Sequence, residues 1–119
     1  MRQLTTTCIG RLGEQIAGSY LELAGFELVG RNVRLGRLEI DLVARRDGLL
    51  CFVEVRLRRH SGFGGAAETI DWRKRRHLRQ GARAYLQQNP AGRCRFDLIT
   101  IDWQPGEGLR LQHLENILQ

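Results

Sequence analysis

Two carboxylates, Asp41 and Glu54, stand inside apolar stretches of the sequence, where a solvated charge is not expected. Glu54 is flanked by Val53 and Val55. A half-buried carboxylate costs free energy unless it has a partner. A pair of carboxylates, completed by water and phosphate oxygens, is a ligand set that suits Mg²⁺. Both residues are therefore candidate ligands of a divalent cation.

The turn between two predicted strands decides how these carboxylates meet. Residues 38–45 and 49–57 have the apolar character of strands, and Asp47-Gly48 between them is typical of a tight two-residue turn. In that register Asp41 lies directly opposite Glu54, with both side chains on one face. Opposed Cβ atoms lie roughly 4.5–5.5 Å apart, so the two charges repel unless one carboxyl stays protonated or a cation separates them. The alternative is a solvated strand face with arginine partners.

The same register sets Glu39 opposite Arg56, where the two charges can neutralise each other. An aspartate followed by Glu-x-Lys across a β-hairpin is also the core motif of the restriction-endonuclease-like PD-(D/E)xK superfamily. Here it takes the form of Asp41 and then Glu54-Val55-Arg56.

A longer resemblance covers nearly the whole chain. Four blocks, in this order, resemble the YraN-like family of small predicted bacterial endonucleases, which is distantly similar to archaeal Holliday-junction resolvases. The blocks are "GRLGEQIAGSYLELAGFELVGRNVR", "EIDLVARRDGLLCFVEVRLRR", "FGGAAETIDWRKRRHLRQGARAYL" and "RFDLITID".

The resemblance implies roles for the acidic residues. Asp41 and Glu54 are implied to bind Mg²⁺ or Mn²⁺, which activates the attacking water and stabilises charge on the scissile phosphate. Glu14, on the first predicted helix, is implied to help hold the metal or its waters. Its position at the flank of the helix's apolar stripe also fits a solvated residue.

Arg56 stands where the superfamily has lysine. Arginine stays protonated and cannot act as a general base, although it can neutralise the hydroxide or the phosphate. Lys74 is the one lysine among 19 Lys and Arg residues, and it shares a predicted helical face with Leu78, Gly81 and Tyr85. Lys74 either reaches the carboxylates as a substitute or extends along the edge of the core.

The charge of the chain favours an anionic partner. The net charge is +6 and the pI is about 10.2, so nucleic acid is the leading partner, without distinction between DNA and RNA. Phe63, in a Gly-rich loop, is a candidate to stack on a base or to wedge between bases. For each arginine the alternative is a solvated surface residue. The candidate nucleic-acid contacts are Arg58, Arg59, Phe63, Arg73 and Arg76.

The pattern of apolar residues predicts the elements that position these groups. We expect an α/β fold in the order α-β-β-β-α-β-(β), a restriction-endonuclease-like mixed sheet flanked by helices, as a single nuclease-like domain over residues 1–119. The first helix covers residues 7–24, with its apolar stripe at Ile9, Leu12, Ile16, Tyr20 and Leu23, and Gly25 ends it. The other elements are a strand at 26–34, the hairpin, a helix at 69–88 ended by Asn89-Pro90, a strand in "CRFDLITID" and a short last strand.

Composition excludes several classes. No apolar run is long enough for a membrane span, and the first residues lack a signal-peptide core, so we expect a cytoplasmic protein without membrane contact. The three cysteines are odd in number and have no CxxC spacing, which disfavours a disulfide framework or a zinc site. Cys51 and Cys94 are expected to be small core residues.

The function expected from these features is a Mg²⁺-dependent endonuclease that hydrolyses phosphodiester bonds of DNA. The similarity to resolvases adds branched or structured DNA as the substrate, and a homodimer. A second hypothesis is a nucleic-acid-binding module on the nuclease fold, with little or no catalysis because of Arg56. A third is an RNA-directed nuclease.

Overall fold

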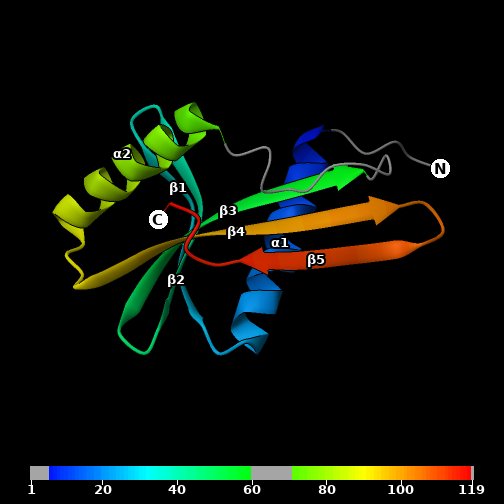
Figure 1. Cartoon of the computed structure of the whole chain (residues 1–119), viewed down its shortest axis with the longest axis horizontal. Coiled ribbons are helices and arrows are strands. Elements are labelled where there is room, and N and C mark those ends of the chain that lie inside the picture. Colours follow the sequence, from blue (N-terminus) through cyan, green and yellow to red (C-terminus); the bar gives the residue numbers. More distant parts are fainter. Residues whose placement is uncertain (1–5, 60–70, 119) are drawn as a thin grey trace.

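The computed structural model describes residues 6–59 and 71–118. Within them, two helices and five strands follow one another in the predicted order α-β-β-β-α-β-β (Figure 1). The uncertain last strand of the prediction is a regular element. The helices are α1 (Thr6–Leu23) and α2 (Trp72–Gln88), and the strands are β1 (Glu27–Leu35), β2 (Leu38–Arg46), β3 (Leu49–Arg59), β4 (Arg93–Gln104) and β5 (Gly108–Leu114).

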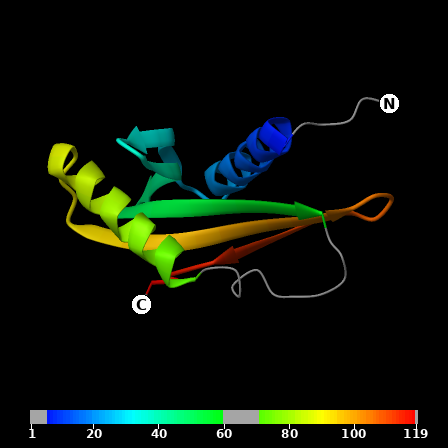
Figure 2. The same ribbon diagram turned by 90° about the horizontal axis from the view of Figure 1, so that it is seen from above.

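The five strands form one mixed sheet in the order β1-β2-β3-β4-β5. Neighbouring strands are antiparallel except β3 and β4, which are parallel and are joined through α2. A parallel pair needs such a crossover because a tight turn cannot return the chain in the same direction. In this strand order β3 is the central strand, and α1 and α2 pack on opposite faces of the sheet (Figures 1 and 2).

Helix α1 packs on the sheet through Ile16 and Tyr20 of the predicted stripe and through residues that the stripe did not include. Ala17 and Leu21 are fully buried. Gly13 lies so close to β3 that an added Cβ atom would be 3.0 Å from the Cβ of Leu57. Leu12 and Leu23 were predicted to be buried, but they are 41% and 90% exposed. The prediction was wrong there because glycine and alanine, which allow close packing, carry little hydrophobic signal.

Helix α2 begins at Trp72, three residues later than predicted. Asp71 caps it, and the Asp71 side chain accepts a hydrogen bond from the backbone N–H of Lys74 at 2.9 Å. Its buried face consists of Leu78, Gly81 and Ala82, which pack near Ile40 and Phe52.

The predicted turns and one of the two predicted core cysteines are confirmed. Gly25 has φ 93°, and Asp47 and Gly48 have φ 50° and 77°, as a primed two-residue hairpin turn requires. Cys51 is fully buried, whereas Cys94 is exposed at the start of β4, so its predicted place in the core was wrong. No helix of the described segments is long and apolar enough to cross a membrane.

Candidate metal and catalytic site

The β2–β3 hairpin opens at the two carboxylates that the sequence analysis singled out. Its ladder has the predicted register, but the last paired residues are Leu42 and Val53. Beyond them, the Val55 N–H donates to Oδ2 of Asp41 at 2.9 Å, so a side chain takes up a backbone donor at the end of the ladder. Asp41 and Glu54 are thus the first residues past the paired region, rather than a cross-strand pair within it.

The cause of this opening lies in the pairing of β2 with β1. Arg31 pairs with Leu42, and Val33 pairs with Ile40, which leaves Asn32 opposite Asp41. Asn32 has φ 48°, a left-handed conformation that is uncommon inside a strand.

Strand β2 changes faces at this point. Residues two apart along a regular strand share a face, yet Leu42 packs in the core under α1 and Ile40 packs in the core under α2. The irregularity therefore turns β2 away from β3 and leaves Asp41 between the two helix-covered faces.

The predicted cross-strand pair of Glu39 and Arg56 was wrong because of the same irregularity. Glu39 is a cross-strand partner of Arg34 on β1, and among the described residues no ion pair joins Glu39 to Arg56. Glu39 belongs instead to a cluster of three carboxylates.

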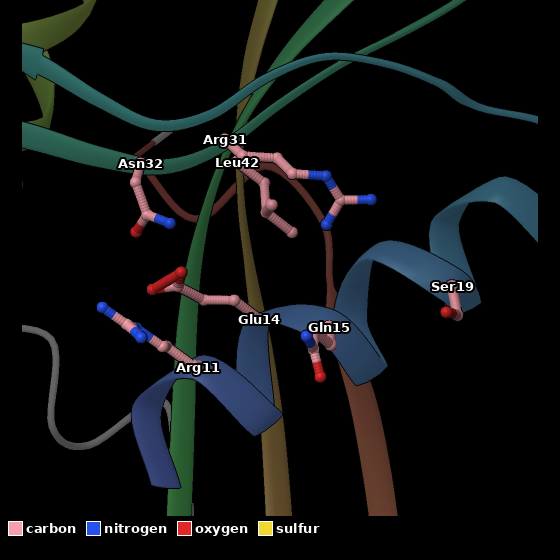
Figure 3. A pocket seen from close by; sticks show the side chains of 7 residues that line it. All are labelled: Arg11, Glu14, Gln15, Ser19, Arg31, Asn32 and Leu42. Carbon is pink, nitrogen blue, oxygen red and sulfur yellow. The ribbon is translucent and has the colours of Figure 1, made fainter. Parts of the chain in front are cut away.

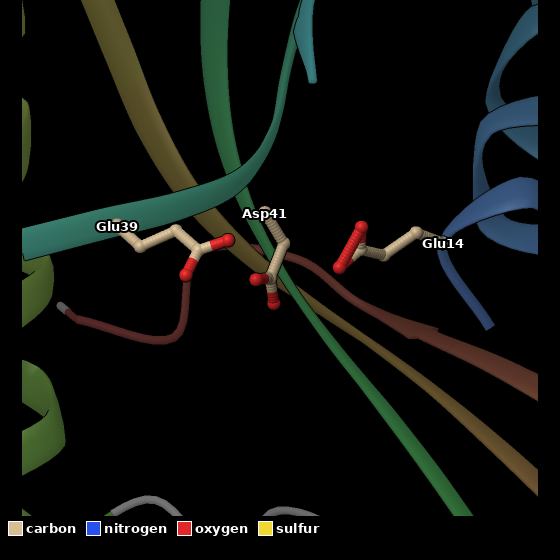
Figure 4. Close-up of side chains that lie close together, drawn as sticks. All are labelled: Glu14, Glu39 and Asp41. Atoms are coloured by element: carbon tan, nitrogen blue, oxygen red, sulfur yellow. The ribbon is translucent and has the colours of Figure 1, made fainter. Parts of the chain in front are cut away.

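Glu14, Glu39 and Asp41 bring one carboxylate oxygen each within 4.8 Å of one another. Figure 4 shows Glu39 and Asp41 projecting from β2 and Glu14 projecting toward them from α1. Glu14 therefore points inward from the flank of its helix, as one of its two predicted alternatives requires. Glu39 was expected to be a partner of Arg56, and its place in the cluster depends on the face change at Asp41.

Glu54 is not part of this group of three and is only 6% exposed. Its Oε1 accepts a contact of 2.9 Å from Nζ of Lys74, which reaches it from the first turn of α2. Oε2 of Glu54 is buried and has no hydrogen-bond partner among the described residues. Lys74 thus reaches one of the two predicted carboxylates, Glu54.

The electrostatics of the cluster disfavour several charged carboxylates without a cation. Burial and the neighbouring charge of Glu54 raise the pKa of Asp41 to about 7, although the Val55 N–H and Lys74 act in the opposite direction. Burial and the charge of Asp41 also raise the pKa of Glu14, against a hydrogen bond from the Asn32 side chain that lowers it. A divalent cation would relieve both effects because it favours the ionised carboxylates.

Arg56 lies two residues beyond Glu54 on β3. It is partly buried, and its Nε atom is buried without a hydrogen-bond partner among the residues that the structure describes. Arg56 therefore remains a candidate to contact an anion at this site.

A cavity of about 580 Å³ adjoins Glu14 between α1 and the first two strands (Figure 3). Figure 3 shows Arg11 beside Glu14 and Asn32 and Arg31 across from it. Two guanidinium groups next to an acidic cluster can hold a phosphate beside a cation. Neither arginine was singled out from the sequence, because its role depends on the packing of α1 against β1.

The predicted nucleic-acid contacts have different surroundings. Arg58 forms an ion pair with Asp102 at 3.1 Å, and the guanidinium of Arg59 lies 5.6 Å from the ring centroid of Trp103. Arg73 and Arg76 are exposed on α2, and Phe63 lies outside the described residues. The guanidinium of Arg73 likewise lies 5.6 Å from the ring centroid of Trp72.

A second polar cluster was not predicted. Asp97 is fully buried on β4, where it accepts from His113 Nε2 at 2.8 Å and from Arg95 Nε at 2.8 Å. Tyr20 on α1 bonds to the other ring nitrogen of His113 at 2.9 Å. Burial alone would raise the pKa of Asp97, but the hydrogen bonds from His113, Arg95 and the Asn116 N–H hold that pKa below its ordinary value. This cluster ties α1 to β4 and β5.

Comparison with known proteins gives consistent matches over most of the chain. The model of "Uncharacterised protein family UPF0102" matches residues 13–101. A UPF0102 protein of Pseudomonas savastanoi pv. phaseolicola is 41% identical over 110 residues, which cover 90% of this chain and 89% of that protein. One from Halorhodospira halophila is 44% identical over 93 residues, with 78% and 76% covered, and one from Dechloromonas aromatica is 43% identical over 106 residues, with 89% and 88% covered.

Proposed function

The chain belongs to the UPF0102 family of YraN-like proteins, and from this premise and the geometry of the site we propose that it is a cytoplasmic Mg²⁺- or Mn²⁺-dependent endonuclease of the PD-(D/E)xK type. Its reaction is the hydrolysis of phosphodiester bonds in DNA. The observation that carries the proposal is the contact of 2.9 Å between Lys74 Nζ and Glu54 Oε1, beside Asp41. It places an amine next to two carboxylates although Arg56 occupies the usual position of the lysine.

The residues present fit a divalent cation. Glu54 offers a buried Oε2 atom without a partner among the described residues, and Asp41 has a pKa raised by burial and by the charge of Glu54. All donors are carboxylate oxygens, which Mg²⁺ and Mn²⁺ accept. Asp41 and Glu54 would hold the ion, with Glu14 holding it or its waters. When bound, the cation lowers the pKa of the attacking water and stabilises charge on the phosphate.

The chain's own residues account for the rest of the chemistry. The Val55 N–H fixes the orientation of Asp41. Glu54 orients Lys74, whose side chain is 33% exposed and can therefore also contact a substrate phosphate. Arg56 supplies a permanent positive charge near the same phosphate. Lys74 is the group that can exchange a proton with the nucleophile or the leaving oxygen.

The basic residues around the site position the nucleic acid. Arg11 and Arg31 line the cavity beside Glu14, and Arg73 and Arg76 are exposed on α2. Contacts of this kind bind phosphate groups without selecting a base sequence. The similarity to resolvases supports branched DNA as the substrate and a homodimer as the active form.

The decisive experiment measures cleavage of labelled duplex, single-stranded and four-way-junction DNA in Mg²⁺, Mn²⁺ or EDTA. The variants are Asp41→Asn and Glu54→Gln, which remove a charge at nearly constant volume. Glu107→Gln is the matched control, because Glu107 is an exposed carboxylate in the turn between β4 and β5.

We expect metal-dependent cleavage that both site variants lose and the control keeps. Binding without cleavage by the wild-type protein, in either metal, would contradict the enzyme and favour the binding module. Cleavage that survives both substitutions would show that the catalytic residues lie elsewhere in the chain.

A further inference from the structure

Trp72 is a large aromatic residue that the fold leaves open to solvent. It is the first residue of α2, and 65% of its surface is exposed. The guanidinium of its neighbour Arg73 lies 5.6 Å from the centroid of the indole ring. Because a tryptophan offers the largest apolar surface of any side chain, such exposure is typical of a binding residue.

The cap of α2 fixes Trp72 relative to the candidate catalytic site. The Asp71 side chain accepts from the N–H of Lys74 at 2.9 Å, and the Asp71 carbonyl accepts from the N–H of Arg75 at 3.0 Å. Trp72 and Lys74 are therefore held in one ordered helical turn. Since residues i and i+2 of a helix point to different sides, Lys74 faces Glu54 while the indole faces away from it.

A cavity of about 320 Å³ lies along this other side of the helix. It is lined by Trp72, Arg73, Arg76, His77 and Gln80. The lining combines one aromatic face with two guanidinium groups, an imidazole and an amide, and it includes no carboxylate. An aromatic face binds a nucleobase by stacking, and guanidinium groups bind the phosphate.

We propose that this cavity binds one unpaired nucleotide of a nucleic-acid substrate, with its base stacked on Trp72 and its phosphate held by Arg73 and Arg76. The inference rests on the proposed function, because Trp72 and Lys74 belong to the same helical turn, so that the bound nucleotide would lie close to the phosphodiester that is cleaved. The bases of an intact duplex are stacked on one another, so they cannot present a face to the indole. The ligand class is therefore single-stranded nucleic acid, or a junction or flap that contains unpaired bases.

The test is a binding measurement in EDTA, where no cleavage is needed. The chain has two tryptophans, so Trp103→Phe leaves Trp72 as the one source of indole fluorescence. In that background we expect a single-stranded oligothymidine to quench the emission. In an otherwise unchanged protein, Trp72→Ala should weaken binding of the single strand about tenfold, whereas Trp72→Phe should keep most of it.

Two comparisons make the test specific. Binding of a blunt duplex should change by less than about twofold in Trp72→Ala, because phosphate contacts dominate there. Leu109→Ala, which removes another exposed apolar side chain far along the sequence, should leave both affinities unchanged.

The proposal is overturned if Trp72→Ala weakens single-strand and duplex binding equally, if it changes neither, or if the oligothymidine leaves the emission of Trp72 unchanged. A Trp72 that serves to dock a protein would give one of these results. If the wild-type protein cleaves no substrate but shows this Trp72-dependent preference, the proposed nuclease activity is contradicted and the proposed nucleotide site is supported. Metal-dependent cleavage without this preference would support the nuclease activity and contradict the nucleotide site.

Discussion

Lys74 Nζ lies 2.9 Å from Glu54 Oε1, which joins the first turn of α2 to the middle of β3. The contact follows from the crossover between the parallel strands β3 and β4, because α2 must pass back over the sheet to connect them. The first turn of that helix is thereby placed beside Glu54. A lysine on the inner face of α2 can therefore occupy the site although the strand itself carries Arg56.

Removal of the Lys74 amine should abolish most of the cleavage. We expect Lys74→Ala to lower the rate by about 10²-fold or more, which is the usual size of a proton-transfer contribution. Lys74→Arg keeps the charge but cannot exchange a proton, so unchanged cleavage in that variant would contradict the catalytic role. Arg75→Ala, an exposed neighbour, is the control in single-turnover cleavage assays.

Replacement of Arg56 by lysine, the residue in the nuclease motif that this hairpin resembles, should bring little gain. If Lys74 already supplies the amine, Arg56→Lys replaces one cation near the phosphate by another, and cleavage should stay within about threefold of the wild-type rate, a difference of less than 1 kcal/mol in activation free energy. The measurement is the cleavage rate over a range of pH. A gain of tenfold or more would show that position 56 is where the reaction needs its lysine.

Asp41 should make stability depend on pH in the absence of metal. Its pKa is about 7 in the folded chain and 3.8 for an ordinary aspartate, so the folded state binds an extra proton between these two pH values. The free energy of unfolding contributed by Asp41 is therefore fully present below pH 4 and is lost as the pH rises through 7, by up to about 4 kcal/mol. Asp41→Asn should lack this loss in urea unfolding at pH 5 and pH 8 in EDTA.

Mn²⁺ provides the internal control for that measurement. A bound cation favours the ionised carboxylate, so Mn²⁺ should stabilise the wild-type protein at pH 8 and have little effect on Asp41→Asn. Equal pH slopes for the two proteins in EDTA would contradict the raised pKa of Asp41, and equal stabilisation by Mn²⁺ would contradict a cation site there.

Local patterns in the sequence were sufficient to predict those structural features that depend on residues close together in the chain. Asp47-Gly48 predicted the hairpin and its register, since both residues tolerate positive φ. Helical spacing predicted that Lys74 shares the inner face of α2 with Leu78. The position of Glu14 at the flank of an apolar stripe allowed an inward side chain, but it left a solvated one equally open.

Features that arise from packing were not predictable in this way. The face change at Asp41 depends on the left-handed Asn32 in the adjacent strand, and a regular alternation therefore misplaced Glu39. The tight contact of Gly13 with β3 has no hydrophobic signature. The cluster around Asp97 joins segments that are far apart in the sequence, and no local pattern marks it.

Asp97 should be a determinant of stability rather than of catalysis. Asp97→Ala leaves Arg95 and His113 without their buried partner, so we expect a loss of about 3–5 kcal/mol in the free energy of unfolding. Because the pKa of Asp97 is lowered in the folded state, its contribution is present at neutral pH and is lost as the pH falls through that lowered value. The stability difference between wild type and Asp97→Asn should therefore shrink in acid, as urea unfolding at pH 7 and pH 3 would measure. A constant difference would contradict the charge-based role.

Two substitutions of Asn32 should distinguish the effect of backbone strain on stability from the effect of the Asn32 amide on Glu14. Asn32→Gly keeps the φ of 48° without strain, whereas Asn32→Ala adds roughly 1–2 kcal/mol for the left-handed conformation, so the glycine variant should be the more stable in thermal unfolding. Both variants lose the amide that bonds to Glu14 and lowers its pKa. We therefore expect both to bind Mn²⁺ more weakly than the wild type, to a similar extent once folded. Full Mn²⁺ affinity in Asn32→Gly would show that only the backbone of Asn32 matters, because the position of Asp41 would then be set without the amide.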